Sequence, residues 1–321
     1  MYEVAIQTKL GKAFEFACLQ SLYNHLLNNQ NIIIEENSAL TNARDSYNND
    51  AEEDMKRKLN EGADAATRII LRLEPQLENP LTNVPLYLAI QEDAMGIAGD
   101  VRDVICIRRQ NQWEIGLSCK HNHSAVKHSR LSPSIDFGAQ WIGLPCSQQY
   151  FDTIDLLFNE LREMRDNGQL WRDINNKERR FYIPLLRAFM EELKRLDIAN
   201  PGIVPERLLH YLLGRNDFYK VITHDRRRVT QVQSFNIFGS LNKNAGTARP
   251  LVNVPQLTMP TRFYNVDFKP HSGNTILVAC DNGWTISMRI HNARSLVEPS
   301  LKFDVGLVGI PQTLYTQYEP W

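Results

Sequence analysis

Residues 99–130, GDVRDVICIRRQNQWEIGLSCKHNHSAVKHSR, decide the fold that the sequence predicts. Two runs of β-branched or bulky residues, 104–107 and 113–117, flank the polar residues 109–112. Such runs on either side of a short polar segment are typical of two strands joined by a tight loop. The stretch therefore predicts a β-hairpin.

The open end of this hairpin carries charged side chains. A four-residue loop places Asp103 opposite Ser118, and because side chains alternate along a strand, Lys120 lies on the same face as Ser118. Carboxylate oxygens bind hard cations such as magnesium, which polarise a phosphoryl oxygen and activate water. A neighbouring lysine can orient that water and offset the charge developing on the phosphate. Asp103 and Lys120 are thus candidates for phosphodiester hydrolysis; a hairpin held by their salt bridge is the simpler interpretation.

Asp103 at a strand start, followed on the next strand by Ser118, Cys119 and Lys120, resembles the signature of the PD-(D/E)xK nuclease superfamily. The resemblance implies an α+β fold with a mixed sheet flanked by helices, and Mg²⁺ as the cofactor. It implies Asp103 as the principal metal ligand, the backbone carbonyl of Cys119 as a further ligand, and Lys120 as the residue that positions the attacking water. The sequence departs from the signature at Ser118, where the superfamily usually has Glu or Asp.

A second acid is expected to compensate for Ser118. Asp100 lies three residues before Asp103, and Glu15 lies on a helix predicted over residues 11–28 from apolar residues at helical spacing. Many nucleases of the superfamily carry a glutamate on a helix before the hairpin, so the resemblance extends to Glu15. Without the resemblance, Glu15 is equally explained as a solvated helix residue. Asp100 and Glu15 are the two candidates for the additional metal ligand.

The run 120–130 that begins at the candidate lysine is rich in hydrogen-bond donors and contains no acid. Residues 102–130 contain six lysines and arginines against two acids, a balance that attracts phosphates. Together with the strand-end lysine, the run is similar to restriction endonucleases of the HaeIII type, which implies double-stranded DNA as the partner and GGCC as the target. The residues of the run expected to contact DNA are His121, Asn122, His123, Lys127, His128, Ser129 and Arg130.

Length and composition bound the class of protein. The 321 residues, 43% of them hydrophobic, suffice for one large domain or two ordinary ones, and the net charge of −1 argues against a general nucleic-acid coat protein. Five scattered cysteines predict reduced thiols in the cytoplasm. The sequence contains no apolar run near the ~20 residues of a membrane-spanning helix, no secretory signal and no Gly-rich nucleotide-binding loop. Neither a membrane nor a nucleotide cofactor is therefore expected.

The rest of the chain predicts two regions of different character. Residues 1–215 are expected to form the nuclease core with a helical insert, and residues 216–321, with six predicted strands, a β-rich region that contacts DNA. Arg226, Arg227 and Arg228 are its candidate phosphate contacts, although a solvated sheet edge would also explain them. Further helices are predicted within residues 37–73 and over 147–166, 180–196 and 204–213, a loop over 93–99, and strands over 32–34, 219–223, 229–238, 263–268, 275–279, 284–290 and 303–308.

These observations predict a magnesium-dependent type II restriction endonuclease that hydrolyses duplex DNA at a short palindrome. A palindrome suits a homodimer with a two-fold axis, and a monomer that nicks each strand in turn is the other arrangement. Two other functions are compatible with the same residues. One is a non-cleaving, sequence-specific DNA-binding protein that has lost a metal ligand at Ser118, and the other is a repair or resolvase nuclease of the same fold.

Overall fold

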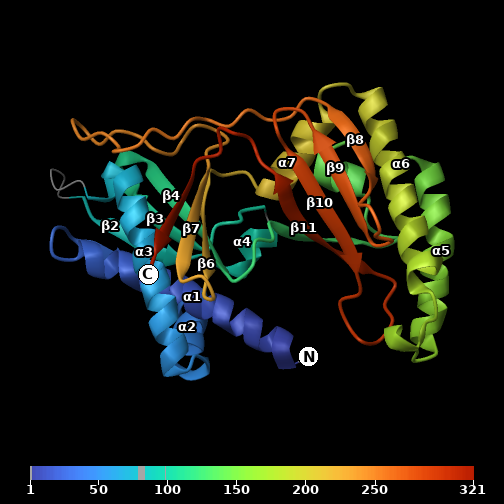
Figure 1. The fold of residues 1–321 in the computed structure, drawn as a ribbon, viewed down its shortest axis with the longest axis horizontal. Helices are drawn as coiled ribbons and strands as arrows, with labels where there is room; N and C mark the ends of the chain where they lie inside the picture. Colours follow the sequence, from blue (N-terminus) through green and yellow to red (C-terminus); the bar gives the residue numbers. More distant parts are fainter. Residues whose placement is uncertain (1, 79–83, 98) are drawn as a thin grey trace. The chain divides into compact units, whose positions relative to one another are not determined.

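The computed structural model of the chain describes residues 2–78, 84–97 and 99–321 (Figure 1). The chain forms two compact units. Unit 1 comprises Met1–Ser124, Arg215–Leu257 and Gln312–Trp321, and unit 2 comprises Ala125–Gly214 and Thr258–Pro311. The chain therefore divides differently from the two consecutive regions that were expected, because the first strands after residue 215 join the sheet of the predicted hairpin.

Unit 1 contains a mixed seven-stranded sheet in the order β1-β2-β3-β4-β6-β7-β12. β1 is parallel to β2 and β4 is parallel to β6, while the other neighbours are antiparallel. Helices and a mixed sheet together confirm the predicted α+β class. The strands are β1 (Ile32–Ile34), β2 (Leu86–Ile90), β3 (Val104–Arg108), β4 (Trp113–His121), β6 (Phe218–His224), β7 (Val229–Phe235) and β12 (Thr316–Pro320).

β3 and β4 form the hairpin predicted from residues 99–130. The ladder ends at the pair Val104–Leu117, and the backbone N–H of Asp103 donates to the carbonyl of the same Leu117 over 2.7 Å. The strands are joined by the short 3-10 helix η3 (Arg109–Asn111). Asp103 therefore lies at the open end of the hairpin, directly before the first residue of β3.

Helices α1 and α3 contribute apolar residues to the hydrophobic core of unit 1. On α3, Leu59, Ala63, Ala66 and Ile70 recur at three- and four-residue spacing and are buried in one cluster with the sheet. The helix expected from residue 11 already begins at residue 2, and the expected loop at 93–99 contains a short helix instead. The helices of this unit are α1 (Tyr2–Leu26), α2 (Ser38–Asp45), η1 (Ser46–Asp50), α3 (Glu53–Leu73), η2 (Pro75–Leu77) and α4 (Asp93–Ile97).

Unit 2 contains an antiparallel five-stranded sheet in the order β5-β11-β10-β9-β8. A turn at residues 281–283 joins β9 to β10, with Asn282 at φ 55° and Gly283 at φ 84°, as expected for an Asn-Gly hairpin turn. The strands are β5 (Lys127–Leu131), β8 (Phe263–Phe268), β9 (Thr275–Cys280), β10 (Thr285–His291) and β11 (Leu301–Gly309). The helices are η4 (Gly138–Ile142), α5 (Gln148–Asp166), η5 (Trp171–Asp173), η6 (Glu178–Tyr182), α6 (Ile183–Ala199) and α7 (Val204–Leu213).

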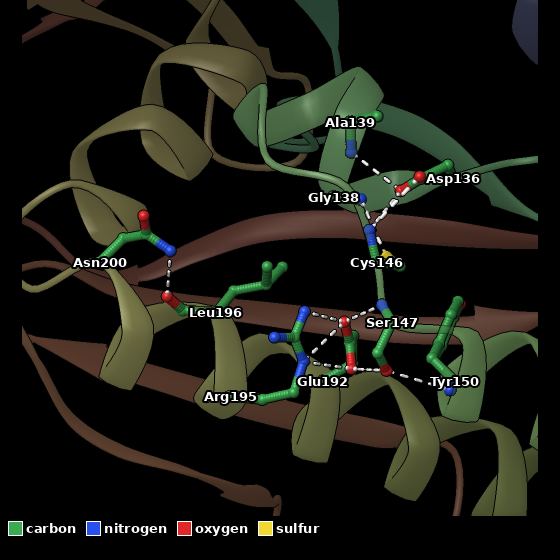
Figure 2. A network of polar contacts seen from close by, with 10 residues as sticks. All are labelled: Asp136, Gly138, Ala139, Cys146, Ser147, Tyr150, Glu192, Arg195, Leu196 and Asn200. Carbon is green, nitrogen blue, oxygen red and sulfur yellow. Dashed lines mark hydrogen bonds and ion pairs between the residues drawn. The ribbon is translucent and has the colours of Figure 1, made fainter.

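A polar network fixes the start of α5 against α6 (Figure 2). Ser147 caps α5, since its Oγ accepts from the backbone N–H of Tyr150 over 3.2 Å. Glu192 of α6 accepts from both the N–H and the Oγ of Ser147, over 2.7 and 2.8 Å, and from Arg195. The polar groups named here form hydrogen bonds with one another, so we assign this network a role in packing α5 against α6. Within the described residues, no helix combines the length and apolar character needed to cross a membrane.

Candidate active site

Asp103 and Lys120 meet at the open end of the β3–β4 hairpin. Asp103 Oδ2 lies 3.1 Å from Lys120 Nζ and accepts a 2.6 Å hydrogen bond from the backbone N–H of Cys119. About a fifth of each charged side chain is exposed, 22% for Asp103 and 19% for Lys120. Burial lowers the pKa of Lys120, but the charge of Asp103 and its hydrogen bond outweigh burial and raise that pKa overall. Lys120 is therefore an ammonium at neutral pH.

Glu15 joins this pair from helix α1. Its side chain is buried, and its Oε2 lies 3.2 Å from Lys12 Nζ. Burial raises the pKa of Glu15 to about 8, and the negative charge of Asp103 adds to the rise against the charges of Lys12 and Lys120. The two carboxyl groups are thus close enough to repel each other, and a proton or a cation would relieve that repulsion.

Cys119 offers its backbone to this cluster, whereas its thiol lies in the core. A hydrogen bond with Cys18, together with burial, raises the pKa of the Cys119 thiol well above its ordinary value. The N–H and C=O of one strand residue point to the same side of the strand, and the N–H of Cys119 points at Asp103. The carbonyl oxygen of Cys119 therefore faces the end of β3 where Asp103 lies.

Asp100 does not belong to the cluster, which corrects the expectation that it helps to hold a metal. Its Oδ1 accepts from Arg102 Nε over 2.8 Å, and its Oδ2 accepts from Arg102 Nη2 over 2.7 Å and from Asn216 over 2.9 Å. Arg102 lies across Gly116, where a Cβ atom would come within 2.1 Å of Arg102 Cδ. Both carboxylate oxygens are therefore engaged in a buried ion pair that stabilises the sheet.

Ser118 of β4 pairs with Lys220 on β6. Lys220 is buried, and its Nζ donates to the carbonyl of Ser124 over 2.6 Å. Burial lowers the pKa of Lys220 to about 7, with a contribution from the charge of Lys120. This second lysine was not among the residues predicted from the sequence. The signal in the sequence that could have identified Lys220 is a single charged residue within the otherwise apolar stretch FYKVI.

The cluster around Lys120 offers two carboxylates, from Glu15 and Asp103. Among the residues that the structure describes, no three His, Cys, Asp or Glu side chains form a group that could hold a metal ion. The Cys119 carbonyl is a further oxygen donor. Magnesium is commonly held by one or two carboxylates and completes its shell with water, so the donor set is compatible with this ion.

The family model of the HaeIII restriction endonuclease matches residues 11–311. The chain belongs to the HaeIII restriction endonuclease family. The type II restriction enzyme HaeIII of Haemophilus aegyptius is 43% identical to it over 311 residues, which make up 97% of each protein. No solved structure matches the chain. Membership of this family indicates that the protein cleaves DNA at specific sites.

His121 and Asn122 were expected to contact DNA, but in this member of the HaeIII family they hold the end of β4. His121 Nε2 lies 2.9 Å from Asp225 Oδ2, and Asn122 Oδ1 accepts from the backbone N–H of Asp225 over 3.0 Å. The His121 side chain is 8% exposed. His123, the next residue but one, is exposed.

The rest of the donor-rich run lies in unit 2, on β5. Lys127 Nζ donates to the Tyr211 carbonyl over 2.9 Å and lies 3.6 Å from the centre of its ring, and burial lowers the pKa of Lys127 to about 8. Ser129 Oγ lies 3.2 Å from the same tyrosine's hydroxyl. Lys127 and Ser129 thus face α7, whereas Arg130 is exposed, with Ser300 at 3.0 Å. The side chain of His128 lies outside the described part of the structure.

Arg226, Arg227 and Arg228 lie on the turn between β6 and β7, and all three are exposed. Arg228 donates to Glu61 over 3.0 Å, so its charge is partly neutralised. Because β4 and β6 are parallel, their carboxyl ends lie at the same edge of the sheet. The arginine turn therefore lies at the edge where Lys120 stands.

Proposed function

We propose that the protein is a magnesium-dependent type II restriction endonuclease that hydrolyses phosphodiester bonds of double-stranded DNA at a short palindrome. The observation that carries the proposal is the meeting of Glu15, Asp103 and Lys120 at one end of a hairpin. In this proposal the seven-stranded sheet with its helices is a PD-(D/E)xK nuclease core. Ser118 occupies the position of the usual acid, and Glu15 of α1 provides the second carboxylate.

Magnesium fits the donor set in charge as well as in ligand type. Two carboxyl groups repel each other here strongly enough to contribute to a raised pKa of Glu15, which a divalent cation would reverse. Asp103 and Glu15 would hold the ion together with the carbonyl of Cys119. When bound, such an ion polarises the scissile phosphate and lowers the pKa of a coordinated water.

Lys120 would serve as an electrostatic and positioning group. Its pKa is raised by Asp103, so it carries a positive charge at neutral pH and is a poor general base. An ammonium 3.1 Å from Asp103 can hold the attacking water by a hydrogen bond and offset the negative charge that develops on the phosphate. Proton transfer from the water therefore falls to another acceptor, such as solvent or a phosphate oxygen.

Exposed basic residues would bind the DNA backbone. Arg226 and Arg227 lie at the same edge of the sheet as Lys120, His123 is exposed two residues after the end of β4, and Arg130 is exposed on unit 2. The target proposed is GGCC, which the resemblance to HaeIII-type enzymes implies, and a palindrome would be met by two copies of this chain. A cytoplasmic location stays a prediction from the five unpaired cysteines.

A plasmid of known sequence tests this function. The protein is incubated with the plasmid and Mg²⁺, with a matched sample in EDTA, and the ends of the products are mapped. Discrete fragments that end within GGCC and appear only with Mg²⁺ support the proposal. Nicks without site preference would instead indicate a repair or resolvase nuclease, and intact DNA at high protein concentration with specific binding would indicate a non-cleaving DNA-binding protein.

A further inference from the structure

The catalytic strand β4 and the arginine turn are joined by a compact set of polar contacts. His121, which directly follows Lys120, lies with its Nε2 2.9 Å from Asp225 Oδ2. Asp225 directly precedes Arg226 in the turn. One hydrogen bond thus connects the neighbour of the candidate catalytic lysine with the neighbour of an exposed arginine.

Asn122 reinforces this connection on both sides. Its backbone N–H donates to the Thr223 carbonyl over 3.0 Å, and its Oδ1 accepts from the N–H of Asp225 over 3.0 Å. Asn122 has a φ of 59°, in the left-handed region that asparagine tolerates better than most residues. The end of β4 is therefore held in one conformation against the start of the β6–β7 turn.

The His121 ring is enclosed, which strengthens its contact with Asp225. The side chain of His121 is 8% exposed and that of Asp225 14%. The ring centre of Phe14 lies 6.5 Å from that of His121, and Phe14 is followed on α1 by Glu15. Hydrogen bonds shielded from water are stronger than exposed ones. The His121–Asp225 pair therefore lies where the candidate metal helix, the catalytic strand and the arginine turn come together.

Arg226 and Arg227 are available for a ligand. Both are exposed, and the contacts of the described residues include no ion pair or side-chain hydrogen bond for either. Arginine guanidinium groups bind phosphate oxygens in a forked geometry, and such contacts set the register of a protein on DNA. A DNA strand bound at these two side chains would lie next to Asp225.

We infer that the His121–Asp225 pair is a positioning link in the proposed cleavage reaction, through which a phosphate held by Arg226 and Arg227 is kept in register with Lys120. The inference rests on the proposed nuclease function and deepens it. His121 and Asp225 do not touch the reacting atoms. They act through the end of β4 that carries Lys120 and through the turn that carries the two arginines.

Three variants test the link. Asp225→Ala removes the acceptor, His121→Phe keeps a ring without the donor, and His121→Gln keeps an N–H at about the position of Nε2. We expect Asp225→Ala and His121→Phe to lower the single-turnover cleavage rate at saturating DNA by about 10- to 100-fold, because a displacement of about 1 Å can cost 100-fold. His121→Gln should restore most of the rate. Asp173→Ala, an exposed aspartate of unit 2, is the matched control.

A double-mutant cycle separates a link from a merely structural contact. Arg226→Ala/Arg227→Ala is combined with Asp225→Ala, and the cleavage rate and the metal-free DNA affinity are measured for all four proteins. If the pair transmits the phosphate contact, the combined loss of rate is much smaller than the product of the separate losses. Multiplicative losses, or a rate lost equally in His121→Gln and His121→Phe, overturn the inference.

The outcomes also separate this inference from the proposed function. If the wild-type protein does not cut DNA, the proposed function fails. If the wild type cuts and Asp225→Ala or His121→Phe cuts at the same rate, only the positioning link fails. Circular dichroism and thermal melting show whether each variant folds. If Asp225→Ala does not fold, the comparison of His121→Gln with His121→Phe still decides.

Discussion

Asp103 and Lys120 are 17 residues apart in sequence, and the hairpin brings Asp103 Oδ2 to within 3.1 Å of Lys120 Nζ. Asp103→Ala should lower cleavage by about 1,000-fold and Lys120→Ala by about 100- to 1,000-fold, because each removes charge that stabilises the transition state. Specific DNA binding, measured by filter binding without metal, should remain. Lys9→Ala, an exposed lysine of α1, serves as the control. Full activity in both variants would show that Asp103 and Lys120 do not form the active site.

Glu15 is expected to act through the metal. Glu15→Gln removes one of two carboxylates, so the Mg²⁺ concentration that gives half-maximal cleavage should rise by about 10- to 100-fold, with activity largely recovered at high Mg²⁺. Glu53→Gln, a 90% exposed glutamate, should leave the Mg²⁺ dependence unchanged. An unchanged Mg²⁺ dependence in Glu15→Gln would show that Glu15 is not a ligand.

The raised pKa of Glu15 also predicts how stability depends on pH. The folded metal-free protein retains this proton up to a pKa of about 8, whereas the unfolded chain loses it near 4.5. The contribution of Glu15 to stability is therefore fully present below pH 4.5 and is lost as the pH rises towards 8. In urea denaturation without metal, the wild type should lose stability relative to Glu15→Gln over this range. A constant difference between the two proteins would contradict the raised pKa.

Lys220 predicts a dependence of opposite sign. Burial lowers its pKa to about 7, while the unfolded chain keeps the proton to about 10.5, so this group makes stability rise with pH between these values. Lys220→Met removes the buried charge, and its stability relative to the wild type should be highest below pH 7 and should fall towards pH 9. Urea melts at pH 6 and pH 9 measure this difference, and no change in it would argue for a normal pKa.

Asp100 is expected to matter for stability and not for catalysis. Asp100→Ala leaves Arg102 buried without its main partner, which should cost about 3 to 5 kcal/mol and lower the melting temperature markedly. At a temperature where the variant is folded, its Mg²⁺ dependence should equal that of the wild type. A large shift in Mg²⁺ dependence would instead show that Asp100 helps to bind the metal.

The local part of the site was predictable from the sequence. A hairpin with a short loop determines which residues face each other, so the proximity of Asp103 and Lys120 could be predicted from spacing alone. The long-range part was not predictable in this way. The parallel pairing of β4 with β6 brings Lys220 next to Ser118 and Asp225 next to His121, and local periodicity carries no information about such pairing. For the same reason the contacts of His121 and Asn122 with Asp225 could not be predicted.

The division of the chain into two units could not be predicted from the sequence for a related reason. β6 and β7 look like the other strands of the C-terminal region, and only their partners differ: β6 and β7 join unit 1, while β8 to β11 form the sheet of unit 2. Strand β5 was not predicted because its sequence, KHSRL, is mostly polar. Two of its polar residues, Lys127 and Ser129, are satisfied by Tyr211 of α7, which no strand pattern indicates.

The central claim is that a divalent ion binds between Asp103 and Glu15. Its most direct test is a crystal of the protein soaked in Mn²⁺, whose anomalous scattering locates the ion. We predict a peak in contact with both carboxylates and the carbonyl oxygen of Cys119, and its loss in Asp103→Ala. A peak at another group of acids, or none at this edge under conditions that support cleavage, would contradict the account.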